Sequence, residues 1–199
     1  MTIERMRAYR KTYIAMLISS TLSLIASLVL SIDAWKLAGN PKSKFACDIN
    51  AVVSCGKVAK SWQSTLLGFP NSFIGLMTEP VVITVAIAGL ALVAFPKGFL
   101  RVAHVVYGLG LIFALWLLSQ SFFVIKAFCP WCLLVTVSTI TVFSTMSRIV
   151  IMENVWNLSE LTHEKALTFL EKGWGRVIYS AIYSFLAIAI ILKYGNQIF

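Results

Sequence analysis

Long apolar stretches, separated by charged or turn-forming residues, constrain this chain more than any other feature of its sequence. About 20 helical residues span the hydrocarbon core of a bilayer, and 59% of the 199 residues are hydrophobic while only 13% are charged. The sequence therefore predicts an all-α integral membrane protein that forms a single membrane domain over 1–199. The five expected spans are 12–32, 72–95, 102–125, 129–147 and 177–194.

Two polar stretches connect these spans. The loop over 38–70 is far longer than a usual connection, and long loops of this kind tend to be functional. A short helix on the membrane surface is expected within 53–67. The stretch over 149–176 is expected to be a cytoplasmic amphipathic segment, with a helix that is capped at 157–160 and ends at Gly173.

The basic residues are interpreted as membrane anchors and topology determinants, although the net charge of +9 is high. They punctuate the apolar stretches and form no basic stripe suited to nucleic acid. With a cytoplasmic N-terminus, Lys and Arg divide as ten inside and seven outside. The positive-inside rule favours this orientation, since four basic residues precede the first span. The 38–70 loop then lies outside, where disulfides persist.

Cys129-Pro130-Trp131-Cys132 is a C-x-x-C motif at the expected start of the fourth span. Pro130 suits the first helical position, and the free amides and positive dipole end of a helix stabilise a thiolate at Cys129. The spacing also lets the two sulfurs close and open a small ring. The motif therefore predicts reversible thiol chemistry, and two buried apolar cysteines are the alternative.

Cys47 and Cys55 lie eight positions apart in the outer loop. They are close enough to form a disulfide, which we expect to be exposed and easily attacked. Two cysteine pairs, one in a loop and one at the membrane boundary, can relay electrons by thiol–disulfide exchange. A purely structural disulfide is the alternative. A zinc site is disfavoured because the gap is too long for a zinc knuckle and no histidine lies nearby.

A series of short motifs resembles the pattern of the vitamin K epoxide reductase family over about residues 15–148. The resemblance implies a four-helix bundle around a quinone, here within 12–148, and the fifth transmembrane helix lies beyond it. The motifs are Cys47-Asp48, Ser54-Cys55, Ser61, Asn71-Ser72-Phe73-Ile74-Gly75 and Cys129-x-x-Cys132.

The resemblance also implies roles for individual residues. Cys129 and Cys132 would form the active centre beside the quinone ring, with Cys132 facing the quinone and Cys129 exchanging disulfides with a loop cysteine. Cys47 and Cys55 would be the shuttle pair that meets the partner protein. Asn71 would hydrogen-bond a quinone oxygen, and a helix cap is its alternative role. Which loop cysteine joins Cys129 is left open.

Glu79 lies about two helical turns beyond Asn71, so we expect it to face the same cavity and to take up or deliver protons. An ionisable group within a span is a functional candidate, and simple hydration near the helix end is the alternative. Thr136 stands where the animal enzymes carry a tyrosine that contacts the quinone. This difference argues against epoxide reduction.

The implied cofactor is a membrane quinone, either menaquinone or ubiquinone, and neither a metal nor nucleic acid is expected. The implied electron donor is a separate thioredoxin-fold thiol oxidase of the cell envelope. The implied location is the inner (plasma) membrane of a bacterial cell. Two other functions stay open: a non-enzymatic membrane protein with structural disulfides, and reverse electron flow from quinol to thiols.

Overall fold

The computed structural model describes residues 3–50 and 52–198, and most of these residues are helical. Five of the helices are long and apolar enough to cross a membrane, which confirms the predicted all-α membrane fold. No β-strand occurs in the described ranges, although one isolated β-bridge does. The long helices are α1 (Ile3–Gly39), α3 (Ser72–Leu90), α4 (Lys97–Gln120), α5 (Pro130–Met152) and α7 (Trp174–Ile198), and the shorter elements are α2 (Cys55–Ala59), η1 (Trp62–Thr65), η2 (Ser121–Ile125) and α6 (Glu160–Glu171).

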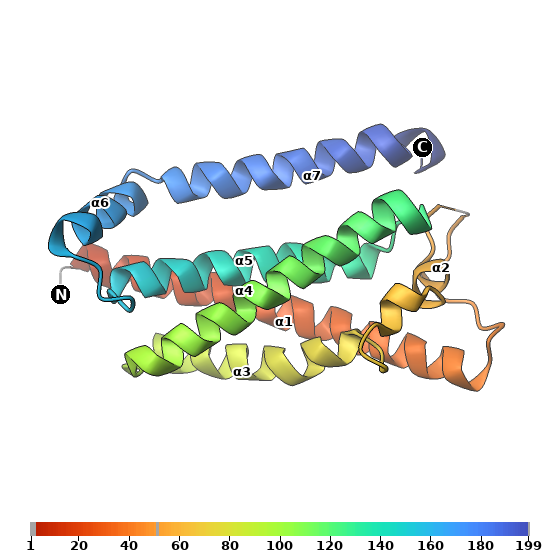
Figure 1. Ribbon diagram of the computed structural model, residues 1–199, viewed down its shortest axis with the longest axis horizontal. Coiled ribbons are helices and arrows are strands. Elements are labelled where there is room, and N and C mark those ends of the chain that lie inside the picture. Colours follow the sequence, from red (N-terminus) through yellow and green to blue (C-terminus); the bar gives the residue numbers. More distant parts are fainter. Residues whose placement is uncertain (1–2, 51, 199) are drawn as a thin grey trace.

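Helices α1, α3, α4 and α5 form a bundle, in which α1 packs against α3 and α5, and α4 packs against α5. Buried side chains such as Met16, Val82, Val142 and Ile149 fill its core. Helix α7 lies outside the four-helix bundle (Figure 1) but contacts it, for example through the hydroxyls of Thr141 and Tyr183 at 2.7 Å, and its most apolar stretch has no buried residue. Its outward surface is therefore available to lipid.

Two glycines allow α1 and α3 to approach closely. A Cβ atom at Gly75 would meet the Ser27 hydroxyl oxygen at 2.1 Å, and one at Gly89 would meet the Tyr13 ring at 2.2 Å. Lipid tails are as apolar as the helices, so helix association in a membrane depends on close packing and on small residues at the interface. Each glycine thus admits a side chain of α1 into the interface.

The observed helices extend beyond several of the predicted spans. Helix α1 continues through Asp33 and Lys36 to Gly39, because polar residues at a membrane surface do not interrupt backbone hydrogen bonding. Helix α4 ends at Gln120 and passes into the π-helical turn η2, which closes at Lys126 in the left-handed conformation (φ 53°). The backbone thus turns sharply before α5, the fourth helix of the bundle, begins.

The predicted surface helix over 53–67 is only partly correct, since two short pieces, α2 and η1, replace it. The predicted helix within 149–176 is confirmed as α6. Gly173 follows α6 with φ +77°, as expected for a helix-ending glycine. The hydroxyl of Ser159 does not cap the helix and instead pairs with Thr162.

The two ends of the bundle differ in what they carry. The N-terminal part of α1 lies at the same end as α6, whereas α2, the loop that precedes it and the C-terminus lie at the other end (Figure 1). All the motif cysteines therefore gather at the end opposite to the start of α1. Which end faces the cytoplasm stays a prediction from the charges.

Candidate thiol–disulfide redox site

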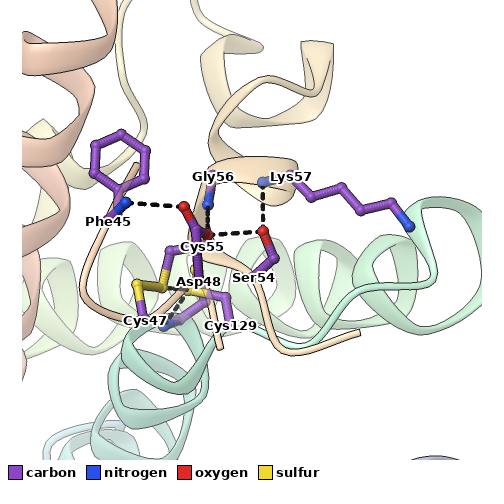
Figure 2. The surroundings of a disulfide bond; sticks show 9 residues. Phe45, Cys47, Asp48, Ser54, Cys55, Gly56, Lys57 and Cys129 are labelled. Atoms are coloured by element: carbon purple, nitrogen blue, oxygen red, sulfur yellow. Dashed lines mark hydrogen bonds between the residues drawn. A yellow bond between two sulfur atoms is a disulfide. The ribbon is translucent and has the colours of Figure 1, made fainter. Parts of the chain in front are cut away.

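The four cysteines meet where the loop after α1 folds over the start of α5. Cys47 and Cys55 form a disulfide, with Cα atoms 5.7 Å apart, and Cys129 and Cys132 are free thiols. The Cys129 sulfur lies 3.5 Å from the Cys55 sulfur, as the close approach in Figure 2 shows. The structure thus identifies Cys55 as the loop cysteine that faces the C-x-x-C motif.

The loop disulfide is buried, so the expectation that it is exposed is wrong. Cys47 is 8% exposed and Cys55 only 2% exposed. Phe45 and Cys129 belong to the same buried cluster, against which side chains of α1 and α2 pack. The eight-residue spacing indicated that the two sulfurs could form a disulfide. It could not indicate that the disulfide is buried, because the side chains that cover it belong to other elements of the fold. The loop therefore covers the disulfide almost completely in this arrangement.

Asp48 organises the loop around the disulfide. Its carboxylate accepts hydrogen bonds from the backbone N–H of Phe45 (2.9 Å) and of Gly56 (2.8 Å), and from the Ser54 hydroxyl (2.7 Å). Burial raises the pKa of this carboxyl, but the two N–H groups, the hydroxyl and the charge of Lys60 together lower it more, so the pKa of Asp48 lies below its ordinary value. The charged carboxylate therefore ties the residue after Cys47 to the start of α2 (Figure 2).

A short backbone bridge attaches the same loop to the segment between α4 and α5. The N–H of Ser54 donates to the carbonyl of Phe128 at 3.0 Å, and the N–H of Phe128 donates to the carbonyl of Val52 at 2.7 Å. Phe128 directly precedes Cys129, and Ser54 directly precedes Cys55. The bridge therefore sets the distance between the two facing sulfurs.

The start of α5 supports a thiolate at Cys129, as the sequence predicts. Cys129 is the N-cap residue and Pro130 is the first helical residue, and the N–H of Cys132 donates to the Cys129 sulfur at 3.2 Å. Hydrogen bonding from the Cys132 thiol and from backbone N–H groups lowers the pKa of Cys129, although burial opposes this shift. Cys129 is thus suited both to attack a disulfide and to leave from one.

A cavity of about 460 Å³ lies beside the sulfurs, and Cys55, Cys129 and Cys132 contribute to its wall. Most of the other lining side chains are apolar and come from α1, α4, α5 and the loop, together with the buried Thr136. Small-molecule sites are typically apolar cavities of about 300–1,000 Å³ with a few convergent polar groups. The size and lining fit the ring of a lipid-soluble quinone.

Asn71 and Gln63 supply polar groups to this cavity. Asn71 precedes α3, but its side chain does not cap the helix, so the alternative role as a cap is wrong. Its Nδ2 donates to the backbone carbonyl of Gln63 at 2.6 Å, while its buried Oδ1 has no partner. Gln63 is buried and donates to Gln120 at 3.4 Å. Gln63 could not be predicted as part of the site, because a glutamine in a polar loop carries no local signal in the sequence.

Glu79 is not among the residues that line the cavity. It is buried inside the bundle, where its Oε1 accepts hydrogen bonds from Ser23 of α1 and Tyr107 of α4. His104 of α4 also lies outside the cavity lining, and its ring Nε2 forms a hydrogen bond with the Ser147 hydroxyl of α5. Among the described residues, no three His, Cys, Asp or Glu side chains form a group that could hold a metal ion.

The geometry can be compared with known protein families. The sequence model of the vitamin K epoxide reductase family matches residues 14–147, which run from α1 to α5 and include all four cysteines. A comparison with curated proteins gives no match. Helices α6 and α7 lie outside the matched residues.

Proposed function

Because the chain belongs to the vitamin K epoxide reductase family, and is thus a membrane oxidoreductase, we propose that it oxidises a thioredoxin-fold protein and passes the electrons to a quinone. The donor is a separate thiol oxidase of the cell envelope, and the acceptor is menaquinone or ubiquinone of the membrane pool. The single observation that carries the proposal is the 3.5 Å separation of the Cys55 and Cys129 sulfurs beside an apolar cavity.

The first transfer takes two electrons from the partner. A partner thiolate attacks the Cys47–Cys55 disulfide and releases one loop cysteine, so that a mixed disulfide joins the partner to the other loop cysteine. The second partner thiol then attacks the partner's sulfur in this mixed disulfide and releases the remaining loop cysteine. The partner leaves as a disulfide, and both loop cysteines are then thiols. Because the loop disulfide is buried, this step requires the loop to open.

The second transfer moves the same two electrons to the C-x-x-C motif. The Cys55 thiolate attacks Cys129 in the Cys129–Cys132 disulfide, and Cys132 leaves as a thiolate. Cys47 then displaces Cys129, which restores the loop disulfide. The observed arrangement, with a loop disulfide and two free thiols on α5, corresponds to the point just after this exchange.

Cys132 and Asn71 are the residues that we assign to the quinone. A bound quinone supplies an acceptor for two electrons and two protons. Cys132 lies in the cavity wall, where its sulfur would react with the bound quinone. The buried Oδ1 of Asn71 would accept a hydrogen bond from a hydroxyl group of the reduced quinone. Gln63 holds the Asn71 amide through its backbone carbonyl. Thr136, in place of the tyrosine of the animal enzymes, favours thiol oxidation over epoxide reduction.

The proposed location is the plasma membrane of a bacterial cell, with the N-terminus in the cytoplasm and the cysteines outside. The gathering of all four cysteines at one end of the bundle supports a single oxidising face. The four basic residues in the N-terminal part of α1 support its orientation. Reverse electron flow, from quinol to partner thiols, uses the same sulfurs and is separated from the proposal by experiment.

The test mixes purified protein in lipid nanodiscs with a reduced thioredoxin-fold protein and a short-chain quinone, and follows quinone absorbance. We expect quinone to be consumed together with one partner dithiol for each quinone. Cys132→Ser should abolish quinone consumption but still allow the partner to exchange with the loop. A structural disulfide would show no consumption in the wild-type protein, and that result would end the proposal.

The direction of flow is tested in the same preparation. Quinol and oxidised partner are supplied instead, and the partner's free thiols are counted by alkylation. We expect few thiols to appear over the time in which the forward reaction is complete. Faster formation of partner thiols than of partner disulfides would reverse the proposed direction.

A further inference from the structure

A row of buried serines runs along the face of α1 that meets the rest of the bundle. Ser20, Ser23, Ser27 and Ser31 follow at spacings of three and four residues, which places them on one helix face. Ser20 bonds back to carbonyls of its own helix, whereas Ser31 and Ser23 contact side chains of α3. The row thus forms a polar seam between α1 and α3.

Glu79 of α3 lies on this seam, and only one of its two carboxyl oxygens has hydrogen-bond partners. Its side chain is only 3% exposed. Oε1 accepts hydrogen bonds from the Ser23 hydroxyl at 2.8 Å and from the Tyr107 hydroxyl at 3.0 Å. Oε2 is buried and has no hydrogen-bond partner. An ionised carboxylate with an uncompensated oxygen is costly in a low-dielectric interior, whereas a proton on Oε2 removes that charge.

The seam connects Glu79 with the cavity. Ser27 lines the cavity and packs directly against Gly75 of α3. Ser23 lies four residues from Ser27 on α1, and Glu79 lies four residues from Gly75 on α3, a rise of about 6 Å along each helix axis. A bridging water molecule can join polar groups that are about one helical turn apart. The carboxyl is therefore one turn away from the cavity wall.

We propose that Glu79 holds a proton on Oε2 in the resting protein and, when its carboxyl group turns so that Oε2 faces Ser23, exchanges this proton with the cavity through Ser23 and Ser27. The proposal deepens the proposed function and, in its link to turnover, rests on it. The polar groups seen to contact Glu79 from the packed helices are Ser23 of α1 and Tyr107 of α4, and both act as donors to Oε1. Neither contact supplies a charge that would favour the ionised form.

The proton count balances over one turnover. Two thiols lose two electrons and two protons, and the quinone site takes up the same number. Glu79 gives its Oε2 proton toward the cavity when a quinone oxygen needs one, and it regains a proton that the Cys129–Cys132 pair loses as its disulfide re-forms. Glu79 acts through the serine hydroxyls and does not touch the quinone. Its role is therefore to store a proton near the cavity and to release it there.

The first test is infrared difference spectroscopy of the purified full-length protein in nanodiscs near neutral pH. Wild type minus Glu79→Gln should show the carbonyl band of a protonated carboxylic acid, shifted by deuterium exchange. The absence of such a band, or an ionised carboxylate band in its place, would overturn the proposal. If Glu79→Gln does not fold, Tyr107→Phe removes one donor to Oε1, and the same band should move without disappearing.

The second test links the proton to the redox site. General acid–base assistance is worth about 10²–10⁴-fold, so a lost proton donor should slow quinone reduction by about tenfold or more in Glu79→Gln. Exchange between Cys55 and Cys129 should keep its rate. Ser20→Ala is the matched control from the same serine row, and it should change neither the band nor the rate. Equal rates of quinone reduction in wild type and Glu79→Gln would refute the link.

Failure of the proposed function is distinguishable from failure of this inference. If the wild-type protein does not reduce quinone at all, the proposed function fails, whereas the infrared band still reports the proton on Glu79. If quinone is reduced but the band is missing, only the inference fails.

Discussion

Asp48→Asn is expected to loosen the loop that holds the disulfide over α5. The substitution keeps the size of the side chain but replaces one acceptor oxygen with an NH2 group, which then faces the N–H of Phe45 or the donors at Ser54 and Gly56. Of the three hydrogen bonds to the carboxylate, at least one is lost. A hydrogen bond to a charged group contributes about 1.5–3 kcal/mol, which corresponds to about a tenfold to 150-fold increase in the open loop population.

Hydrogen exchange followed by mass spectrometry measures this opening on a peptide that covers 45–56. The amides of Ser54 and Gly56 are hydrogen-bonded in the closed loop, so their exchange should speed up by the same factor as the open population. Asp33→Asn is a matched control, since it removes a carboxylate of α1 at the same end of the bundle. Equal loop exchange in wild type and Asp48→Asn would refute the assigned role of the carboxylate.

Acid should mimic the substitution. The pKa of Asp48 is lowered in the folded loop, so its stabilising contribution is complete above the ordinary aspartate pKa of about 3.9. It is lost as the pH falls through the lower pKa of the folded state. Loop exchange, corrected for its intrinsic pH dependence, should therefore rise in acid for wild type and stay flat for Asp48→Asn. Parallel profiles for the two proteins would contradict this reasoning.

Two further predictions concern the sulfur relay and the helix interface. Cys47→Ser removes the thiol that displaces Cys129 from Cys55 in the proposed relay, so a Cys55–Cys129 cross-link should accumulate once quinone has oxidised the Cys129–Cys132 pair, and it should appear in peptide mass spectra; its absence would mean that the relay runs through other sulfurs. Gly75→Ala places a Cβ atom 2.1 Å from a serine hydroxyl of α1 and should destabilise the protein by about 1–3 kcal/mol. Gly110→Ala, which has open space around it, should be neutral or slightly stabilising, and equal unfolding midpoints for both variants would contradict the close contact.

The number and order of the spans could be predicted from the sequence because they depend on local properties. An apolar run of about 20 residues has few alternatives to a membrane helix, since every backbone polar group in lipid must be satisfied within the segment. The start of α5 was equally local, because proline suits the first helical position after Cys129. The ends of α1 and the shape of the 53–67 segment were less certain, since these residues lie where water can also satisfy the backbone.

The membrane fold, the position of the thiol pair at a helix start and the family pattern were thus determined by the sequence alone. Only the tertiary structure decided that Cys55 faces Cys129 across 74 residues of chain, that the disulfide is buried, and that Gln63 holds Asn71. It also placed Glu79 inside the bundle, away from the cavity lining. These outcomes depend on which side chains of distant segments pack against each other. Hydropathy and residue spacing are local properties of the sequence, so they do not predict such contacts.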